Sequence, residues 1–117
     1  DYMVEGIQAT YKDFTRNTAR YPKRKELDYL VIGLMNEAGE VGGVYKKMIR
    51  SRTDLKTPNK EGVTVEDRLV DELGDVLWYL TRLCDVLDLD ISDLMSENMH
   101  KLFGKMSKED MKKYRGY

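Results

Sequence analysis

Two pairs of acidic side chains, each pair three residues apart, are the residues of this chain best suited to do chemistry. Glu37 and Glu40 form the first pair, and Glu72 and Asp75 form the second. At about 100° per residue, both pairs lie beside an apolar helical stripe, with the first acid about 60° and the second about 120° from its centre. If the two stripes pack together, the carboxylates converge at one edge of the contact.

Carboxylates gathered in this way repel one another, and their pKa values rise unless a cation lies between them. Carboxylate oxygens are the ligands that Mg²⁺ prefers, and bound Mg²⁺ often contacts substrate phosphates as well. The pattern therefore fits a site for a metal and a phosphate compound. On spacing alone an ordinary solvated helix face is the more common outcome, because the chain holds 21 acids and repeats the spacing at Asp85/Asp88 and Asp90/Asp93.

Helices must position these acids, since apolar residues recur every three or four positions along most of the chain. We expect Asp90 to cap the last helix and Gly104 to end it. Trp78 lies opposite the apolar stripe of its helix and is expected to pack on another helix or subunit. Helices are predicted at about 3–16, 25–51, 65–87 and 91–103, with a charged loop at 52–64.

These elements predict an all-α fold, a four-helix bundle with two long helices in a single domain over residues 1–117. With 20 basic and 21 acidic residues, the net charge of −1 gives no general attraction to nucleic acid or anionic membranes. The single Cys84, expected in the core, and the single His100, expected to be exposed, exclude an intrachain disulfide and Cys/His zinc patterns. No apolar run approaches a membrane span, so we expect a cytoplasmic protein without a membrane partner.

The residues around the four acids closely resemble the two signatures of the MazG-type nucleoside triphosphate pyrophosphohydrolases, in the all-α NTP pyrophosphatase superfamily. The first is the run from Gly33 to Val41, GLMNEAGEV, and the second is the run from Asp71 to Leu80, DELGDVLWYL. A TARYP stretch at 18–22 precedes these signatures. The resemblance covers residues from about 14 to 103.

This resemblance implies a hydrolase that converts nucleoside triphosphates to the monophosphate and pyrophosphate in nucleotide metabolism. It implies that Mg²⁺, with Mn²⁺ as an alternative, is held by the four acids, which become the predicted catalytic and metal-binding residues: Glu37, Glu40, Glu72 and Asp75. A triphosphate is itself anionic, so an acidic site binds it only through bridging cations. A homodimer or homotetramer is also implied, and the thin core of four short helices agrees with it.

Five further side chains are predicted to contact the nucleotide: Tyr21, Lys47, Tyr79, Asn98 and Lys101. Tyr79 follows Asp75 by one helical turn, so contact with sugar or base and simple packing both stay open. Tyr21 either stacks on the base or packs where the second helix begins. Asn98 and Lys101 would reach sugar and phosphate by resemblance, and Lys47 would reach the triphosphate tail.

Two features depart from the family pattern. Many members have a second glutamate immediately before the first acid, a candidate general base, but this chain has Asn36 there, and an amide cannot take a proton. We therefore predict Glu37 or Glu40 as the proton acceptor. The 31 residues between Glu40 and Glu72 are more than is usual, which the loop at 52–64 explains as either a lid or an insertion.

Three alternatives stay open. A related all-α pyrophosphohydrolase with a dedicated substrate, such as dUTP, dCTP or phosphoribosyl-ATP, would share the four acids. A non-catalytic helical interaction module would explain the apolar stripes but not the acids. A nucleic-acid binder would use the basic tail at 105–117, although Glu109 and Asp110 reduce its charge, and we do not expect nucleic acid as a partner.

Overall fold

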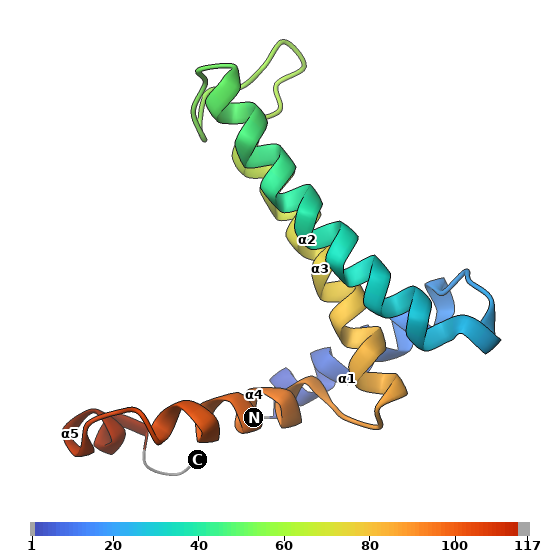
Figure 1. Cartoon of the computed structure of the whole chain (residues 1–117), viewed down its shortest axis with the longest axis vertical. Coiled ribbons are helices and arrows are strands. Elements are labelled where there is room, and N and C mark those ends of the chain that lie inside the picture. Colours follow the sequence, from blue (N-terminus) through green and yellow to red (C-terminus); the bar gives the residue numbers. More distant parts are fainter. Residues whose placement is uncertain (1, 115–117) are drawn as a thin grey trace.

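The computed structural model describes residues 2–114, with side chains from residue 6 onward, so the last three residues of the basic tail lie outside it (Figure 1). No strand occurs among these residues, and the all-α prediction is confirmed. The longer elements are α1 (Tyr2–Thr18), α2 (Glu26–Arg50), α3 (Val65–Val86) and α4 (Ile91–Phe103), and the short ones are η1 (Lys23–Lys25), α5 (Lys108–Met111) and η2 (Lys112–Tyr114).

The two long helices α2 and α3 form an antiparallel hairpin, and their mutual packing is the main tertiary contact of the chain (Figure 1). The loop of residues 51–64 joins them at one end of the hairpin. At the other end α1 packs on the C-terminal half of α3, and α4 leads away from the hairpin (Figure 1). None of the described helices has the length and apolar character that crossing a bilayer requires.

Local hydrogen bonds set where the helices begin. At the start of α3, the Thr64 hydroxyl accepts from the backbone N–H of Asp67 at 3.0 Å, and the Asp67 carboxylate accepts from that of Thr64 at 2.9 Å. At the start of α4, Asp90 is the N-cap residue as predicted, and the Asp93 carboxylate accepts from its N–H at 2.9 Å. Gly104 ends α4, also as predicted.

The loop between the long helices is held by its own side chains. Asp54 accepts hydrogen bonds from backbone N–H groups two and three residues later. Asn59 does the same for Glu61 and Val63, at 2.9 and 3.0 Å. Gly62 has a φ of 80°, a conformation that glycine adopts without steric cost. The predicted loop is therefore confirmed, and it is an ordered structure.

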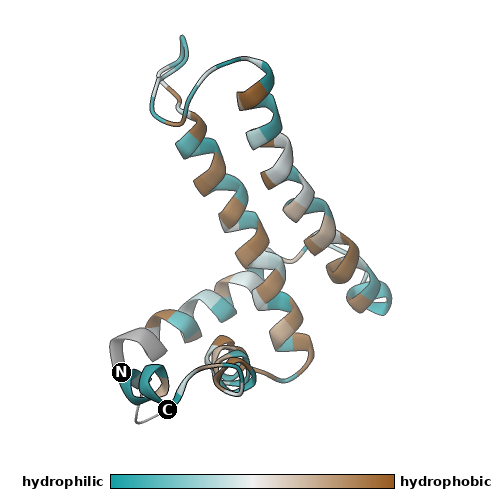
Figure 2. Ribbon diagram, turned by 60° about the vertical axis from the view of Figure 1, so that its left-hand side comes forward, coloured by the Kyte–Doolittle hydropathy of each residue, from teal (hydrophilic) through white to brown (hydrophobic). Residues whose placement is uncertain are grey.

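The core of a single chain is small. Leu30 and Cys84 are the buried apolar side chains in the described part of the chain, which confirms the core position of Cys84. Leu27, Val31 and Leu73, which belong to the predicted apolar stripes, are 49%, 43% and 53% exposed. Apolar positions consequently remain along the outside of both long helices (Figure 2). Within the described residues, one chain does not close a four-helix bundle by itself.

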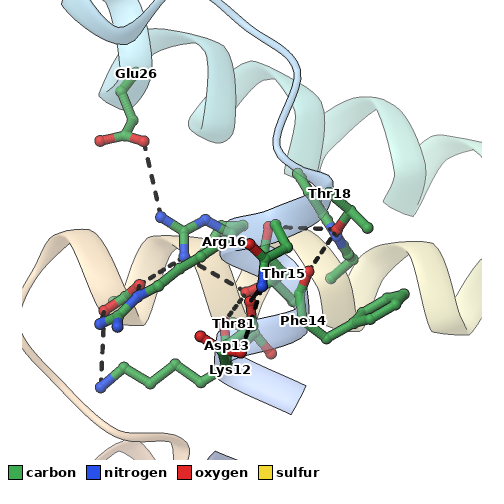
Figure 3. Close-up of polar contacts among 12 residues, drawn as sticks. Lys12, Asp13, Phe14, Thr15, Arg16, Thr18, Glu26 and Thr81 are labelled. Carbon is green, nitrogen blue, oxygen red and sulfur yellow. Dashed lines mark hydrogen bonds and ion pairs between the residues drawn. The ribbon is translucent and has the colours of Figure 1, made fainter. Parts of the chain in front are cut away.

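A polar cluster joins α1, α3 and the start of α2 (Figure 3). Arg82 is only 5% exposed and donates to the Asp85 carboxylate at 2.6 Å, which also accepts from Arg16 at 2.6 and 2.7 Å. The Arg82 guanidinium lies 3.5 Å from the hydroxyl of the fully buried Thr15 and 3.8 Å from the Glu26 carboxylate. This cluster fixes α1 against the base of the hairpin.

Candidate active site

The acids of the two predicted pairs meet where α2 packs on α3. Carboxylate oxygens of Glu37, Glu72 and Asp75 lie within 4.8 Å of one another. Glu37 comes from α2 and the other two come from α3, so the antiparallel hairpin places the two motifs side by side. Glu40 is exposed and lies outside this close group, almost one turn further along α2. Three of the four predicted acids are thus brought together, and the fourth borders them.

The cluster is electrostatically unfavourable as it stands. Burial, together with the charges of Asp75, Glu72 and Glu40, raises the pKa of Glu37 above its ordinary value. Burial and the charges of Asp75 and Glu40 also raise the pKa of Glu72. Among the described residues no basic side chain forms an ion pair with any of the four acids. A donor set made only of carboxylate oxygens fits a hard divalent cation such as Mg²⁺ or Mn²⁺.

An aromatic cavity of about 340 Å³ borders the acids on the side of α1. Glu37 and Asp75 line it, together with polar and aromatic side chains: Thr18, Arg20, Tyr21, Tyr29, Trp78 and Tyr79. The rings of Tyr21 and Tyr29 stack with their centroids 5.0 Å apart. The predicted Tyr21 and Tyr79 both lie beside the acids, whereas Tyr29 and Arg20 were not predicted.

Trp78 forms the wall of this cavity next to α1. It is half-buried and donates a hydrogen bond from its indole N–H to the Thr18 hydroxyl at 2.8 Å. Its ring meets that of Tyr79 edge-on, with centroids 5.0 Å apart. Trp78 thus packs on another helix, one of the two placements that its position opposite the stripe predicted.

Tyr79 lies directly over the backbone of α2. A Cβ atom at Gly33 would be 2.1 Å from the Tyr79 ring, so only glycine leaves room for the ring there. Burial and the neighbouring Tyr29 hydroxyl raise the pKa of Tyr79 to about 12. The Tyr79 hydroxyl therefore stays protonated at neutral pH, and it is suited to hydrogen bonding with a ligand and not to taking a proton.

A second cavity, of about 680 Å³, borders the acids on the side of the loop. Glu40 and Glu72 line it, as do the predicted Lys47 and the unpredicted Arg68. Arg68 lies one helical turn before Glu72 on α3, so the spacing of four residues was the signal in the sequence that pointed to it.

Asn98 and Lys101 lie elsewhere. Both are exposed on α4, which leads away from the hairpin, and neither lines the two cavities beside the acids (Figure 1). Within one chain the structure does not bring them to the acidic cluster. His100, between them, is exposed as expected.

The sequence of this chain is similar to those of known proteins. Residues 25–108 match the MazG nucleotide pyrophosphohydrolase domain, a range that contains all four acids. The chain is also 34% identical over 98 residues to "Gene 37 protein" of Mycobacterium phage L5, covering 79% of this chain and 82% of that protein. No solved structure matches the chain. The chain belongs to the MazG nucleotide pyrophosphohydrolase domain family.

Proposed function

We propose that this protein is a Mg²⁺-dependent enzyme that hydrolyses nucleoside triphosphates, canonical or modified, to the monophosphate and pyrophosphate. The observation that carries the proposal is the meeting of Glu37, Glu72 and Asp75 within 4.8 Å, without a basic partner among the described residues. In a family of nucleotide pyrophosphohydrolases, such a cluster is best explained as the place where the cation and the phosphates bind.

The acids divide into two roles in this proposal. Glu37, Glu72 and Asp75 hold the cation because their oxygens already lie close together. The Mg²⁺ held by these three carboxylates would supply the positive charge that the phosphates need and would lower the pKa of a bound water. Glu40 lies outside the close group and is exposed, so we assign it as the acceptor of the proton from the attacking water, the part that Asn36 cannot take.

The aromatic cavity is the proposed place of the nucleoside. Stacking of a base on an aromatic ring is worth about 1–3 kcal/mol and depends little on which base it is. Tyr21, Tyr29 and Tyr79 form a series of neighbouring rings there, with centroids 5.0 and 6.3 Å apart. The Arg20 side chain and the Thr18 hydroxyl supply polar groups at its edge. This arrangement supports the binding of nucleotides with different bases.

The protein is further proposed to act as a homodimer or homotetramer. The exposed apolar positions along α2 and α3 support association, because a monomer seldom leaves such a surface in water. Asn98 and Lys101 do not line the cavities beside the acids of their own chain. In an oligomer they could lie beside the acids of a second chain.

The test is an assay of the purified protein with a panel of ribo- and deoxynucleoside triphosphates, including dUTP and dCTP, and with phosphoribosyl-ATP. With Mg²⁺ or Mn²⁺ we expect monophosphate and pyrophosphate in equal amounts, and none after EDTA. Glu72→Gln should lower kcat by about 100-fold or more, the scale of losing a main electrostatic group. Glu97→Gln, an exposed acid of α4, is the matched control and should retain activity.

Two results would decide against this proposal. Turnover confined to dUTP, dCTP or phosphoribosyl-ATP would mark a dedicated enzyme of the same superfamily. No turnover of any nucleotide by the wild-type protein, with either metal, would favour the helical interaction module.

A further inference from the structure

The hydroxyl of Tyr21 is bound to a carboxylate that lies outside the aromatic cavity. It donates to the Glu26 carboxylate at 2.5 Å, in the first turn of α2. Tyr21 lines the cavity, whereas Glu26 does not. Burial and this hydrogen bond raise the pKa of Tyr21, so the hydroxyl keeps its proton at neutral pH and acts as the donor. The cavity therefore receives the ring of Tyr21 while the hydroxyl is engaged elsewhere.

Basic side chains hold Glu26 in turn. The guanidinium of Arg82, on α3, lies 3.8 Å from the carboxylate oxygen that accepts from Tyr21 (Figure 3). Lys23 lies 3.6 Å from the same oxygen. Arg82 is only 5% exposed, and its own hydrogen bond to Asp85 at 2.6 Å leaves it little freedom to move. The position of the Glu26 carboxylate is thus tied to the polar cluster at the base of the hairpin.

The ring and the backbone of Tyr21 are held as well. The ring stacks on that of Tyr29 with centroids 5.0 Å apart, and the Lys23 ammonium lies 5.2 Å from its centroid. Pro22 follows directly, and the residue before a proline is restricted to extended conformations. The Lys25 N–H donates to the Pro22 backbone oxygen at 3.1 Å. A ring held in this way binds a ligand without first having to be ordered.

We propose that Glu26 is a positioning residue, which fixes the ring of Tyr21 beside the nucleotide base and keeps the hydroxyl away from the polar edge of the base. This inference rests on the proposed function, in which the base lies in the aromatic cavity. Tyr21 then contributes only the face of its ring, and every base has a π-face that can stack on it. A tyrosine hydroxyl free to enter the cavity would instead donate to or accept from particular bases. The contact with Glu26 consequently makes the site tolerant of different bases.

The first turn of α2 offers a matched control. Glu26 and Asp28 both lie there, where a carboxylate stabilises a helix through the helix dipole. Asp28 is exposed and lines neither cavity beside the acids. Asp28→Ala therefore removes the same contribution to the helix as Glu26→Ala but leaves Tyr21 with its partner.

The test measures the binding of AMP, GMP, CMP and UMP to the Mg²⁺-loaded protein by the fluorescence of Trp78. This residue is the only tryptophan of the chain and lines the aromatic cavity, so a base that enters the cavity changes its emission. Glu26→Ala and Tyr21→Phe should each raise Kd about fivefold or more for all of these nucleotides, because about 1 kcal/mol is the lower end of what base stacking contributes. Asp28→Ala should leave Kd unchanged.

Two further variants separate positioning from a folding defect. Glu26→Gln keeps an oxygen that accepts from Tyr21, so it should restore most of the affinity that Glu26→Ala loses. In the double variant of Glu26→Ala and Tyr21→Phe the two effects should not add, because both substitutions remove the same hydrogen bond. In assays with triphosphate, Glu26→Ala should raise KM and leave kcat within about twofold, since the cation and its carboxylates are not changed.

The outcomes separate this inference from the proposed function. If wild-type protein binds the monophosphates in a Glu26-dependent way but hydrolyses no triphosphate, the function fails and the role of Glu26 stands. If wild-type protein hydrolyses triphosphates while Glu26→Ala and Tyr21→Phe keep its Kd and KM, the role of Glu26 is overturned. A Tyr21→Phe variant that binds some bases less well and others equally well also overturns it, because the hydroxyl would then contact the base. Wild-type protein that neither binds monophosphates nor hydrolyses triphosphates overturns both.

Discussion

The ring of Tyr79 occupies the space where a side chain at position 33 would lie, so this position requires glycine. A Cβ atom there would be 2.1 Å from the Tyr79 ring. The Tyr79 ring also contacts the rings of Tyr29 and Trp78, which limits how far it can move. In Gly33→Ala the ring must leave its place beside Glu37, and overpacking of this kind costs about 1–3 kcal/mol. We expect a lower melting temperature and a higher KM for the nucleotide, measured by calorimetry and steady-state kinetics.

The control for this prediction is another glycine of a helix. Nothing lies within 4 Å of a Cβ built at Gly6 in α1, so Gly6→Ala should stabilise the helix by about 0.5–1 kcal/mol and leave KM unchanged. A Gly33→Ala variant with the KM and melting temperature of the wild type would show that Tyr79 is not held against α2.

The meeting of three acids could be predicted from the sequence, whereas the other side chains that surround them could be predicted less well. Glu37, Glu72 and Asp75 were predictable because their positions follow from helical periodicity and from two recognisable motifs. Arg68 and Tyr29 belong to no such motif. The spacing of four residues from Glu72 was a signal for Arg68, but the place of Tyr29 beside the acids depends on how α2 and α3 pack, which spacing within one helix does not reveal. The roles of Asn98 and Lys101 stay predictions.

Among the elements, α1 depends on Asp85 for its attachment to α3. The Asp85 carboxylate is 9% exposed and accepts from Arg82 and Arg16. Asp85→Asn would leave the buried Arg82 with only the more distant Glu26 carboxylate, at 3.8 Å, as a charged partner, and breaking a buried pair costs about 3–5 kcal/mol. We expect a loss of this size in the free energy of unfolding. Asp110→Asn, which breaks an exposed pair with Lys113, should cost less than about 1 kcal/mol.

The ion pairs of Asp85 with Arg16 and Arg82 also predict how the stability of the protein depends on pH. Hydrogen bonds and charges from Arg16 and Arg82 hold the pKa of Asp85 well below its usual range, although burial opposes them. A carboxyl with a lowered pKa in the folded state stabilises the protein above its unfolded pKa of about 3.9, and this stabilisation is lost as the pH falls below that value. Urea unfolding between about pH 5 and 2 should therefore show a steeper loss for wild type than for Asp85→Asn. Equal slopes would contradict the role given to Asp85.

Helix boundaries were predicted to within about two residues, whereas the contacts between helices were not. Asp85 and Asp88 share the three-residue spacing that is typical of a solvated face, yet Asp85 is nearly buried. Its partner Arg16 lies 69 positions away in the chain. The pattern of residues along one helix does not indicate which side chains of another helix they contact. The polar cluster could therefore be recognised only from the structure.

The single chain is more extended than a compact monomer of its size. Its radius of gyration is 17.9 Å, against about 13 Å for a compact chain of this length. It exposes 9314 Å², whereas a compact monomer of 13.7 kDa exposes about 6,600 Å². The excess of about 2,700 Å² per chain, or about 5,400 Å² for two chains, is at the upper end of the total surface that obligate homodimers bury. These dimensions support the proposed association.

Some of the exposed apolar positions lie on one side of the hairpin. By helical geometry Met35 and Val70, which are 62% and 64% exposed, occupy equivalent positions about 160° from Glu37 and Glu72 on their own helices. Equivalent faces of two antiparallel helices point to the same side, so the apolar surface is continuous across the pair and faces away from the acids. A second hairpin packed on this side would complete a four-helix bundle from two chains.

Association can be tested by light scattering with size-exclusion chromatography. We expect a mass of at least twice 13.7 kDa and a melting temperature that rises with protein concentration. Val70→Asp should shift the mass toward the monomer, because a charge would enter the interface, whereas Lys60→Asp in the loop should leave it unchanged. A wild-type protein that runs as a monomer at all concentrations would contradict the proposal.

The three close carboxylates come from two helices that are far apart in the sequence, so a cation bound to all three would cross-link the chain. Glu37 and Glu72 are separated by 34 residues, so a cation held by both closes a long stretch of chain into a ring, as a disulfide would. Unlike a disulfide, this link forms without an oxidant and is undone by chelation. With the proposed cation bound, the hairpin would be cross-linked reversibly, and the concentration of free divalent cation would set how often its two helices separate.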